Sequence, residues 1–187
     1  MRASVAVLGL AVLFSLGGCE KAGQAVSEKA AGKAVEKAVE QALQQDGTRA
    51  KVDIAEGSVR MTTTDAAGKT SEYQMGAADV TEKDVGVPFY PGAKALDGQS
   101  SRLVTPDGST VSIGLRSSDA PAKVAAFYRD HLKAQAPGKQ FVEMSGGDGN
   151  TMLALNDEKG ESAVQVVIDK SDAETQIQIV AQRRTSK

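Results

Sequence analysis

The sequence is poor in the residue types that most catalytic and metal-binding sites need. Its 187 residues include one cysteine, Cys19, one histidine, His131, and no tryptophan. One cysteine excludes an internal disulfide. A single histidine leaves neither a recognisable zinc ligand set nor a nucleophile–base motif. We therefore expect no catalytic residue, no metal and no cofactor in this chain.

Neither sign of charge is in excess, and aromatic residues are scarce. Lys and Arg number 22 against 24 Asp and Glu, and the chain holds only four phenylalanines and three tyrosines. A nucleic-acid-binding surface typically needs a basic patch with interleaved aromatics. We therefore expect no nucleic-acid partner. The 19 glycines indicate many turns instead.

The chain has one long hydrophobic run, and it lies near the start. Residues 3–16 follow the basic Arg2 and are apolar except for Ser4 and Ser15. The run is short for a membrane-spanning helix, which needs roughly 20 apolar residues. A basic start, a short apolar run and small residues at 17 and 18 are typical of a secretory signal peptide. The sequence thus predicts a signal peptide over residues 1–18.

The residues that follow are Leu16-Gly17-Gly18-Cys19, which resemble the lipobox of bacterial lipoproteins. The resemblance implies cleavage between Gly18 and Cys19. It also implies a thioether-linked diacylglycerol on Cys19 and, in many bacteria, an amide-linked acyl chain such as palmitate. Two or three acyl chains anchor a protein stably to a membrane. In enteric-type lipoproteins, Asp after the cysteine is the usual signal for retention in the inner membrane. Because Glu20 follows the cysteine here, the expected location in a Gram-negative bacterium is the outer membrane, facing the periplasm. The alternative is a plain secreted protein.

Residues 19–47 form a segment of different composition, the lipidated N-terminus followed by a helix. Ala, Glu, Lys and Gln, all strong helix formers, dominate residues 20–46. Small apolar residues recur at helical spacing from Ala34 to Leu43, and Glu36 and Glu40 lie on the other face. We interpret this helix as a spacer. Weak docking on the folded domain and self-association with a second copy are the alternatives.

From residue 48 the pattern changes to the alternation of β-strands. Residues 48–84 are expected to form a small β-meander and a connection. Residues 85–187 are expected to form an α+β domain, in which one helix over about 119–135 packs on an antiparallel sheet. Ser118 or Asp119 is the predicted N-cap of that helix. Its buried stripe is expected to comprise Val124, Phe127, Tyr128 and Leu132.

Residues 86–187 also look like a recurrent module of uncharacterised exported bacterial proteins. The resemblance rests on Val-Pro-Phe-Tyr-Pro-Gly-Ala at 87–93, on Ser-Asp-Ala-Pro at 118–121, and on the helix residues. It implies an exported domain and brings no catalytic residues.

Phe89, Tyr90, Tyr128 and His131 form the candidate ligand or partner surface. If the bend at 87–93 packs on the helix, these aromatic rings come together. The simpler interpretation is core packing, because aromatics supply much of the burial in a chain that has few of them. The functional interpretation is a groove for an extended ligand or a partner.

The function expected from the sequence is therefore that of a non-enzymatic, membrane-anchored binding module whose partner is a protein or an envelope component. One alternative is a small-ligand carrier or envelope enzyme with an aromatic pocket near Tyr90 and Tyr128. Another is a structural lipoprotein that assembles through the 20–47 helix.

Overall fold

The computed structural model describes residues 24–44, 47–55, 57–146, 149–171 and 173–185. The predicted signal peptide and Cys19 lie outside the described residues. Within the described ranges, no helix is both long enough and apolar enough to cross a membrane.

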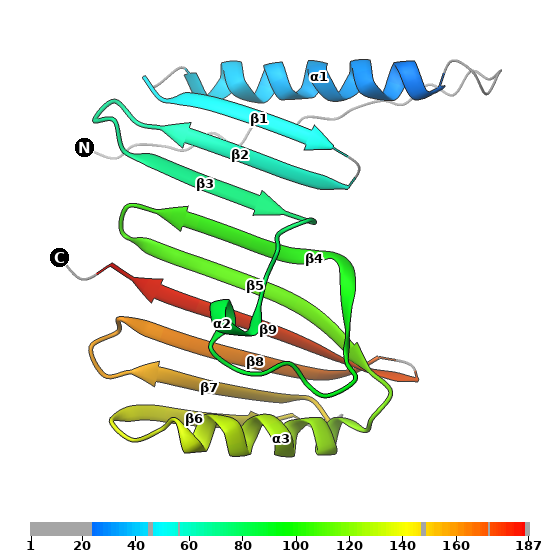
Figure 1. Ribbon diagram of the computed structural model, residues 1–187, viewed down its shortest axis with the longest axis vertical. Coiled ribbons are helices and arrows are strands. Elements are labelled where there is room, and N and C mark those ends of the chain that lie inside the picture. Colours follow the sequence, from blue (N-terminus) through cyan, green and yellow to red (C-terminus); the bar gives the residue numbers. More distant parts are fainter. Residues whose placement is uncertain (1–23, 45–46, 56, 147–148, 172, 186–187) are drawn as a thin grey trace.

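The protein has an α+β fold built on one nine-stranded antiparallel sheet (Figure 1). The strand order is β1-β2-β3-β4-β5-β9-β8-β7-β6, because α3 carries the chain from β5 to the far edge and hairpins then return it toward β5. The elements are α1 (Gln24–Leu43), β1 (Arg49–Ala55), β2 (Ser58–Thr64), β3 (Thr70–Met75), α2 (Glu82–Val85), β4 (Lys94–Thr105), β5 (Gly108–Ser117), α3 (Pro121–Ala134), β6 (Lys139–Ser145), β7 (Thr151–Asp157), β8 (Ser162–Ser171) and β9 (Glu174–Arg184).

The three strands of the meander continue the larger sheet. Strand β3 pairs with β4, in a register that places Glu72 opposite Val104 and Met75 opposite Ser101. Ala78 and Val80, from the connection after β3, are buried in the same core as the later strands. The sheet and its core therefore both cross the boundary predicted at residues 84 and 85.

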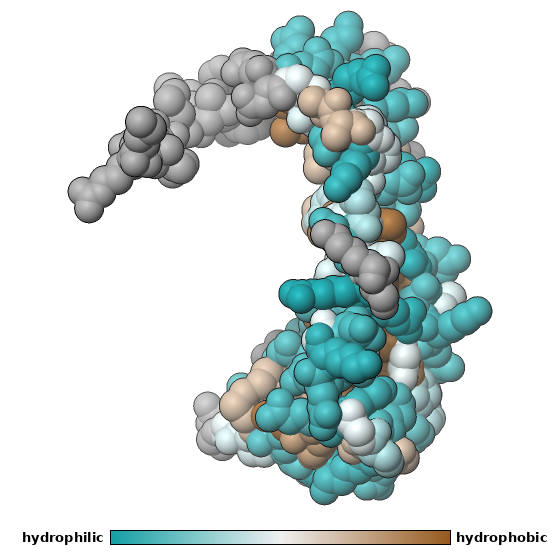
Figure 2. All heavy atoms as spheres, turned by 90° about the vertical axis from the view of Figure 1, so that its left-hand side faces the viewer, coloured by the Kyte–Doolittle hydropathy of each residue, from teal (hydrophilic) through white to brown (hydrophobic). Residues whose placement is uncertain are grey.

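The hydrophobic core lies on one face of the sheet, beneath α2 and α3 (Figure 1). Helix α2 contacts β5 and β9, and α3 contacts β7 and β8. Strands β1–β3 extend beyond this core as a single layer. In Figure 2 the molecule is correspondingly thin at its middle and thicker in the half that holds the two helices.

Helix α3 begins at Pro121, and its N-cap is Ala120. The prediction of Ser118 or Asp119 as the N-cap was wrong, because the Asp119 carboxylate binds the Tyr90 hydroxyl and the Lys123 ammonium instead. Pro121 suits the first helical position because its fixed φ matches the helix and its missing N–H needs no acceptor there.

Helix α2 is one turn long and lies in the segment expected to be a connection. A capping box stabilises its N-terminus. The Asp84 carboxylate accepts hydrogen bonds from the backbone N–H and the hydroxyl of Thr81. Gly86 ends the helix with φ of 74°, in the left-handed region that glycine adopts without strain.

Helix α1 lies along β1 at the edge of the sheet (Figure 1) and contacts it directly. Glu36 Oε1 accepts a hydrogen bond from the Ile54 N–H at 2.8 Å, and Glu40 Oε1 accepts one from the Val52 N–H at 2.9 Å. The docking alternative therefore describes this helix, and the spacer interpretation was wrong for Gln24–Leu43. The physical reason is that an edge strand carries unpaired N–H groups, which carboxylates satisfy and an Ala/Val stripe does not.

The Glu40 hydrogen bond is testable on its own. Glu40→Ala should weaken local protection at β1 by about 1–2 kcal/mol, because the Val52 N–H loses a charged acceptor. Amide hydrogen exchange should then be roughly tenfold faster at Val52 and unchanged in β5 and β9. Glu40→Gln keeps an acceptor oxygen and should retain most of the protection. Equal exchange at Val52 in all three proteins would contradict the docking.

Candidate functional site

The predicted aromatic residues come together around Phe127 on α3. The Tyr90 and Phe127 ring centroids are 5.2 Å apart with an edge-to-face geometry, and those of Phe127 and Tyr128 are 5.1 Å apart. The His131 ring lies 4.2 Å from the Phe127 ring. Phe89 is half-buried and packs against the same core. The bend at 87–93 thus packs on the helix, as the sequence pattern suggested.

This cluster is closed. Tyr128 has 0% of its surface exposed and Tyr90 has 5%. The Tyr128 hydroxyl accepts the Tyr90 N–H at 3.0 Å, and the Tyr90 hydroxyl donates to Asp119 Oδ2 at 2.6 Å. Burial raises the pKa of Tyr128, and the hydrogen bond to Asp119 raises the pKa of Tyr90. Both tyrosines therefore belong to the core, and neither lines an open groove.

His131 is bound within its own helix. Its Nδ1 lies 2.9 Å from the Phe127 carbonyl oxygen, so Nδ1 carries the donated proton in this arrangement. The ring is half-buried against Phe127. Across the described residues, no group of three or more His, Cys, Asp and Glu side chains is placed to hold a metal ion.

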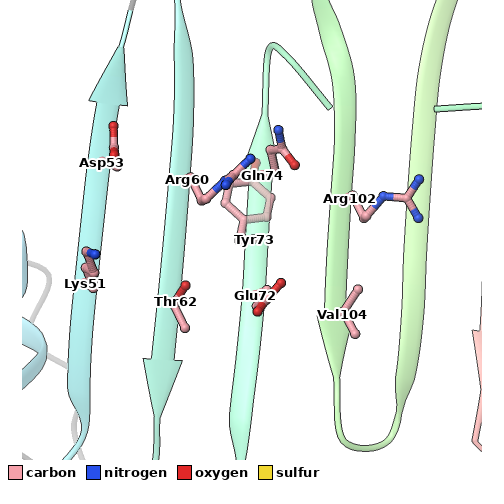
Figure 3. A pocket seen from close by; sticks show the side chains of 9 residues that line it. All are labelled: Lys51, Asp53, Arg60, Thr62, Glu72, Tyr73, Gln74, Arg102 and Val104. Carbon is pink, nitrogen blue, oxygen red and sulfur yellow. The ribbon is translucent and has the colours of Figure 1, made fainter. Parts of the chain in front are cut away.

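A different site lies where the sheet is a single layer. It is on the same face of the sheet that α2 and α3 cover at the later strands. It is a hollow of about 450 Å³ across β1–β4 (Figure 3), which we call the polar hollow. The strand register sets its side chains in two rows. One row holds Asp53, Arg60, Gln74 and Arg102, and the other holds Lys51, Thr62, Glu72 and Val104. Tyr73 also lines the hollow, although its side chain alternates to the opposite face.

Four charged side chains in the polar hollow have no ion-pair partner among the described residues. Lys51 and Arg60 supply positive charge, and Asp53 and Glu72 supply negative charge. Their groups are exposed, so a ligand can reach them. The volume is within the range of small-ligand sites, but such sites usually have mostly apolar walls. The polar hollow therefore suits a polar partner that carries groups of both charges.

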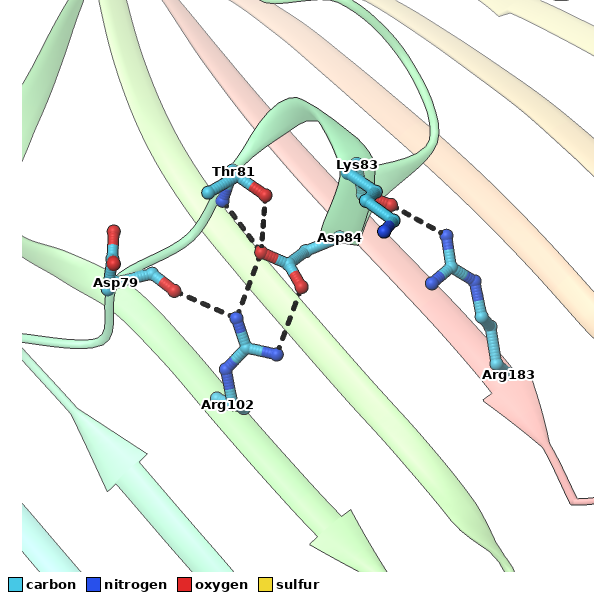
Figure 4. Close-up of polar contacts among 6 residues, drawn as sticks. All are labelled: Asp79, Thr81, Lys83, Asp84, Arg102 and Arg183. Atoms are coloured by element: carbon cyan, nitrogen blue, oxygen red, sulfur yellow. Dashed lines mark hydrogen bonds and ion pairs between the residues drawn. The ribbon is translucent and has the colours of Figure 1, made fainter.

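Arg102 links the polar hollow to α2 (Figure 4). Its guanidinium pairs with both carboxylate oxygens of Asp84, at 3.2 and 3.0 Å, and donates to the Asp79 carbonyl oxygen at 2.8 Å. On the other side of α2, Arg183 donates to the Lys83 carbonyl oxygen at 3.0 Å. Two arginines from the sheet therefore hold this short helix in place.

The hydrogen bonds from Arg102, with those from Thr81, hold the pKa of Asp84 well below its ordinary value of 3.8. The resulting stabilisation is fully present above that ordinary value and is lost as the pH falls toward the lower, folded-state pKa. Arg102→Ala should lower the free energy of unfolding by about 1–2 kcal/mol at pH 7, a modest amount because both side chains are about a third exposed.

Denaturant unfolding at pH 7 and at about pH 2.5 should show a smaller difference between wild type and Arg102→Ala at the lower pH. Arg102→Lys, which keeps the charge and loses the paired geometry, should fall between the two. A difference of equal size at both pH values would contradict the role given to Asp84.

A family model described as START domain-like matches residues 99–182. The match runs from within β4 to within β9 and includes α3. No curated protein and no solved structure matches the chain. Of the residues that line the polar hollow, only Arg102 and Val104 lie within the matched segment.

Sequence reasoning missed the polar hollow. The signal was present, since charged and polar residues recur at every second position in Lys51-Val52-Asp53 and in Glu72-Tyr73-Gln74. Alternation in one strand places them on one face. Only the register between strands shows that the four strands present these residues on the same face.

Proposed function

We propose that this protein is a bacterial lipoprotein, anchored by lipid on Cys19, whose folded part is a non-enzymatic binding module of the cell envelope. The resemblance of Leu16-Gly17-Gly18-Cys19 to a lipobox supports the anchor. The residue after the cysteine, Glu20, favours the outer membrane. The partner on the folded side is a protein or an envelope component.

The observation that carries the binding role is the polar hollow. Exposed charges contribute little to the stability of a fold. Here Lys51, Asp53, Arg60 and Glu72 face an open hollow and form no ion pair with a described residue. Complementary charges on a partner would guide its approach and fix its orientation. The favoured partner is therefore a segment that presents both acidic and basic groups.

The docking of α1 supports a position close to the membrane. The helix begins at Gln24, five residues after Cys19. Five residues span at most roughly 18 Å. Because α1 lies along β1, and β1 forms one wall of the polar hollow, this site would be held near the lipid surface.

The two alternatives differ in their support. A carrier or enzyme with an aromatic pocket needs an opening at Tyr90 and Tyr128, and both side chains are buried. Assembly through the 20–47 helix remains a prediction. The docking of α1 on β1 leaves part of its apolar stripe accessible to a second copy, because Val35 is 51% exposed and Val39 is 36% exposed.

Photo-crosslinking in the native envelope tests the binding role. A photoreactive residue in place of Thr62, inside the polar hollow, should yield one discrete adduct. Arg60→Glu combined with Lys51→Glu should reduce its yield at least fivefold. The matched control is the same residue at Gln140, on the opposite face of the sheet. No adduct at position 62, the same adduct at position 140, or a yield unchanged by charge reversal would contradict the proposal.

A further inference from the structure

The face of the sheet opposite the helices carries three adjacent rows of residues without a single charge. We call these 23 positions the uncharged face; the strand register defines them. The middle row crosses all nine strands: Ile54, Val59, Met75, Ser101, Ser112, Val180, Gln165, Ala154 and Val142. The row on one side is Val52, Met61, Tyr73, Leu103, Thr110, Gln182, Ala163, Asn156 and Gln140. The row on the other side is Gly114, Gln178, Val167, Met152 and Met144.

The absence of charge is unexpected for an open surface. Charged residues make up 25% of the chain, so about six would be expected among 23 positions. On the helix-bearing face of the same strands, Lys51, Asp53, Arg60 and Glu72 are all charged. The single-layer strands therefore sort their charges onto one face and leave the other neutral.

Apart from Val52 and Gly114, which are buried, the uncharged face is open within the described residues. Helices α2 and α3 contact the core on the other side, and α1 contacts the edge strand β1. Ile54 is 37% exposed, Met75 43%, Leu103 37% and Met144 54%. These side chains come from strands at both ends of the sheet, so the exposure is spread over the face.

The composition of this face is that of the centre of a protein–protein interface. Such centres are depleted in charged residues and enriched in Met and Tyr. Of the 23 residues, 14 are apolar, and they include four methionines and Tyr73. A lipid partner fits poorly, because Gln165 and Gln182 would lose their hydrogen bonds in hydrocarbon. A second protein surface can supply such bonds.

We propose that a second copy of this chain covers the uncharged face, sheet against sheet. Nine strands about 4.8 Å apart and up to three rows about 6.8 Å apart span roughly 700 Å² per copy. A stable standard-size interface buries about 800 Å² per partner. A two-fold axis also brings each residue near the same residue of the other copy. A neutral face tolerates this pairing. A charged face would bring like charges together across the axis, and their repulsion would weaken the dimer.

The direction of the two-fold axis follows from the anchor and rests on the proposed function. Both copies attach to one membrane near α1, so their β1 edges must lie at the same end of the dimer. An axis in the plane of the face and perpendicular to the strands achieves this. It places the middle row of one copy over the middle row of the other, with Ser112 opposite Ser112.

Crosslinking of the full-length protein in its native membrane tests the dimer. Ser112→Cys treated with a short bismaleimide should give a covalent product of twice the protomer mass. Thr62→Cys, on the opposite face, is the matched control and should give less than a tenth of that yield. Wild type should give none, because lipid occupies the Cys19 thiol. Adding Gln165→Lys and Met75→Lys to Ser112→Cys should reduce the yield at least tenfold, because both positions are in the middle row and like charges then meet across the axis. Both replaced residues are exposed, and an unchanged unfolding midpoint would show that the fold is retained.

Four outcomes would overturn the dimer: no product at Ser112, equal products at Ser112 and Thr62, no effect of the two lysines, or a product with the mass of a different partner. A product formed only by Val35→Cys would overturn it in favour of assembly through α1. Wild-type crosslinking through Cys19 would contradict the anchor alone. The Ser112 and Thr62 comparison in a Cys19→Ser background would then decide the dimer separately.

Discussion

Replacing Cys19 with serine, in a chain whose residues 1–18 are exchanged for a signal peptide that is cleaved without lipid, should release this protein from the membrane. A serine hydroxyl is too weak a nucleophile to take a diacylglycerol group, so the variant would carry no acyl chains. Each buried CH2 of an acyl chain contributes about 0.8 kcal/mol to membrane binding. Loss of two or three chains should therefore shift the equilibrium from fully bound to essentially unbound, the largest functional effect that we expect from any single substitution.

Membrane fractionation and intact mass are the measurements. Wild type should sediment with membranes and show the mass of residues 19–187 plus its acyl groups. Cys19→Ser should show only unmodified polypeptide. A globomycin-type inhibitor of signal processing should raise the mass of the wild-type protein by that of the signal peptide, less that of any amide-linked acyl chain, because that acyl chain needs the amino group that cleavage frees. Glu20→Asp is the matched control, because it keeps the anchor and, in an enteric-type bacterium, should move the protein to the inner membrane. A Cys19→Ser protein that has lost its signal peptide and still remains membrane-bound would refute the anchor.

Tyr128→Ala should lower the free energy of unfolding by about 3–5 kcal/mol. The side chain is fully buried, and its removal leaves a cavity between α3 and the sheet. The Tyr90 N–H also loses its acceptor. Denaturant unfolding, monitored by circular dichroism, measures the change.

Tyr128→Phe separates the two contributions. It keeps the ring and removes only the hydroxyl, so it should cost about 1–2 kcal/mol, the penalty of an unpaired buried N–H. His131→Gln, on the same helix, is the control. It should lower the free energy of unfolding by less than about 1 kcal/mol, because the His131 ring is only half-buried. A Tyr128→Ala protein as stable as wild type would show that the ring is not part of the core and would restore the aromatic-groove hypothesis.

Elements set by local periodicity were predicted well. The helix expected over about 119–135 spans Pro121–Ala134, and the alternating segments are strands. The contact between Tyr90 and the helix was also foreseeable, because the prolines and glycine at 88–92 favour a bend and Phe127 belongs to the apolar stripe. The helix and the strands depend on residues that are close together in sequence, whereas the contact of Tyr90 with the helix joins two such segments.

The orientation of α1 could not be predicted from its own residues. Its sequence favoured a spacer, with weak docking as an alternative, yet Glu36 and Glu40 face the sheet and Val35 is exposed. The deciding factor is the row of unpaired N–H groups on β1, which exists only once β1 is the edge of the sheet. Helix α2 differs from α1, because its own residues did carry a signal. Thr81 and Asp84 have the spacing of a capping box, and sequence reasoning missed it.

By itself, the sequence determined the α+β class, the position of α3 and most strands, and the expected lipid anchor at Cys19. All of these follow from composition, from periodicity or from a short contiguous motif. The tertiary structure alone decided that the aromatic cluster is closed, that α1 caps an edge, and that strands β1–β3 sort their charges onto one face. The reason is physical: a strand places its side chains alternately on two faces, but which residues meet across strands depends on a register that no single strand contains.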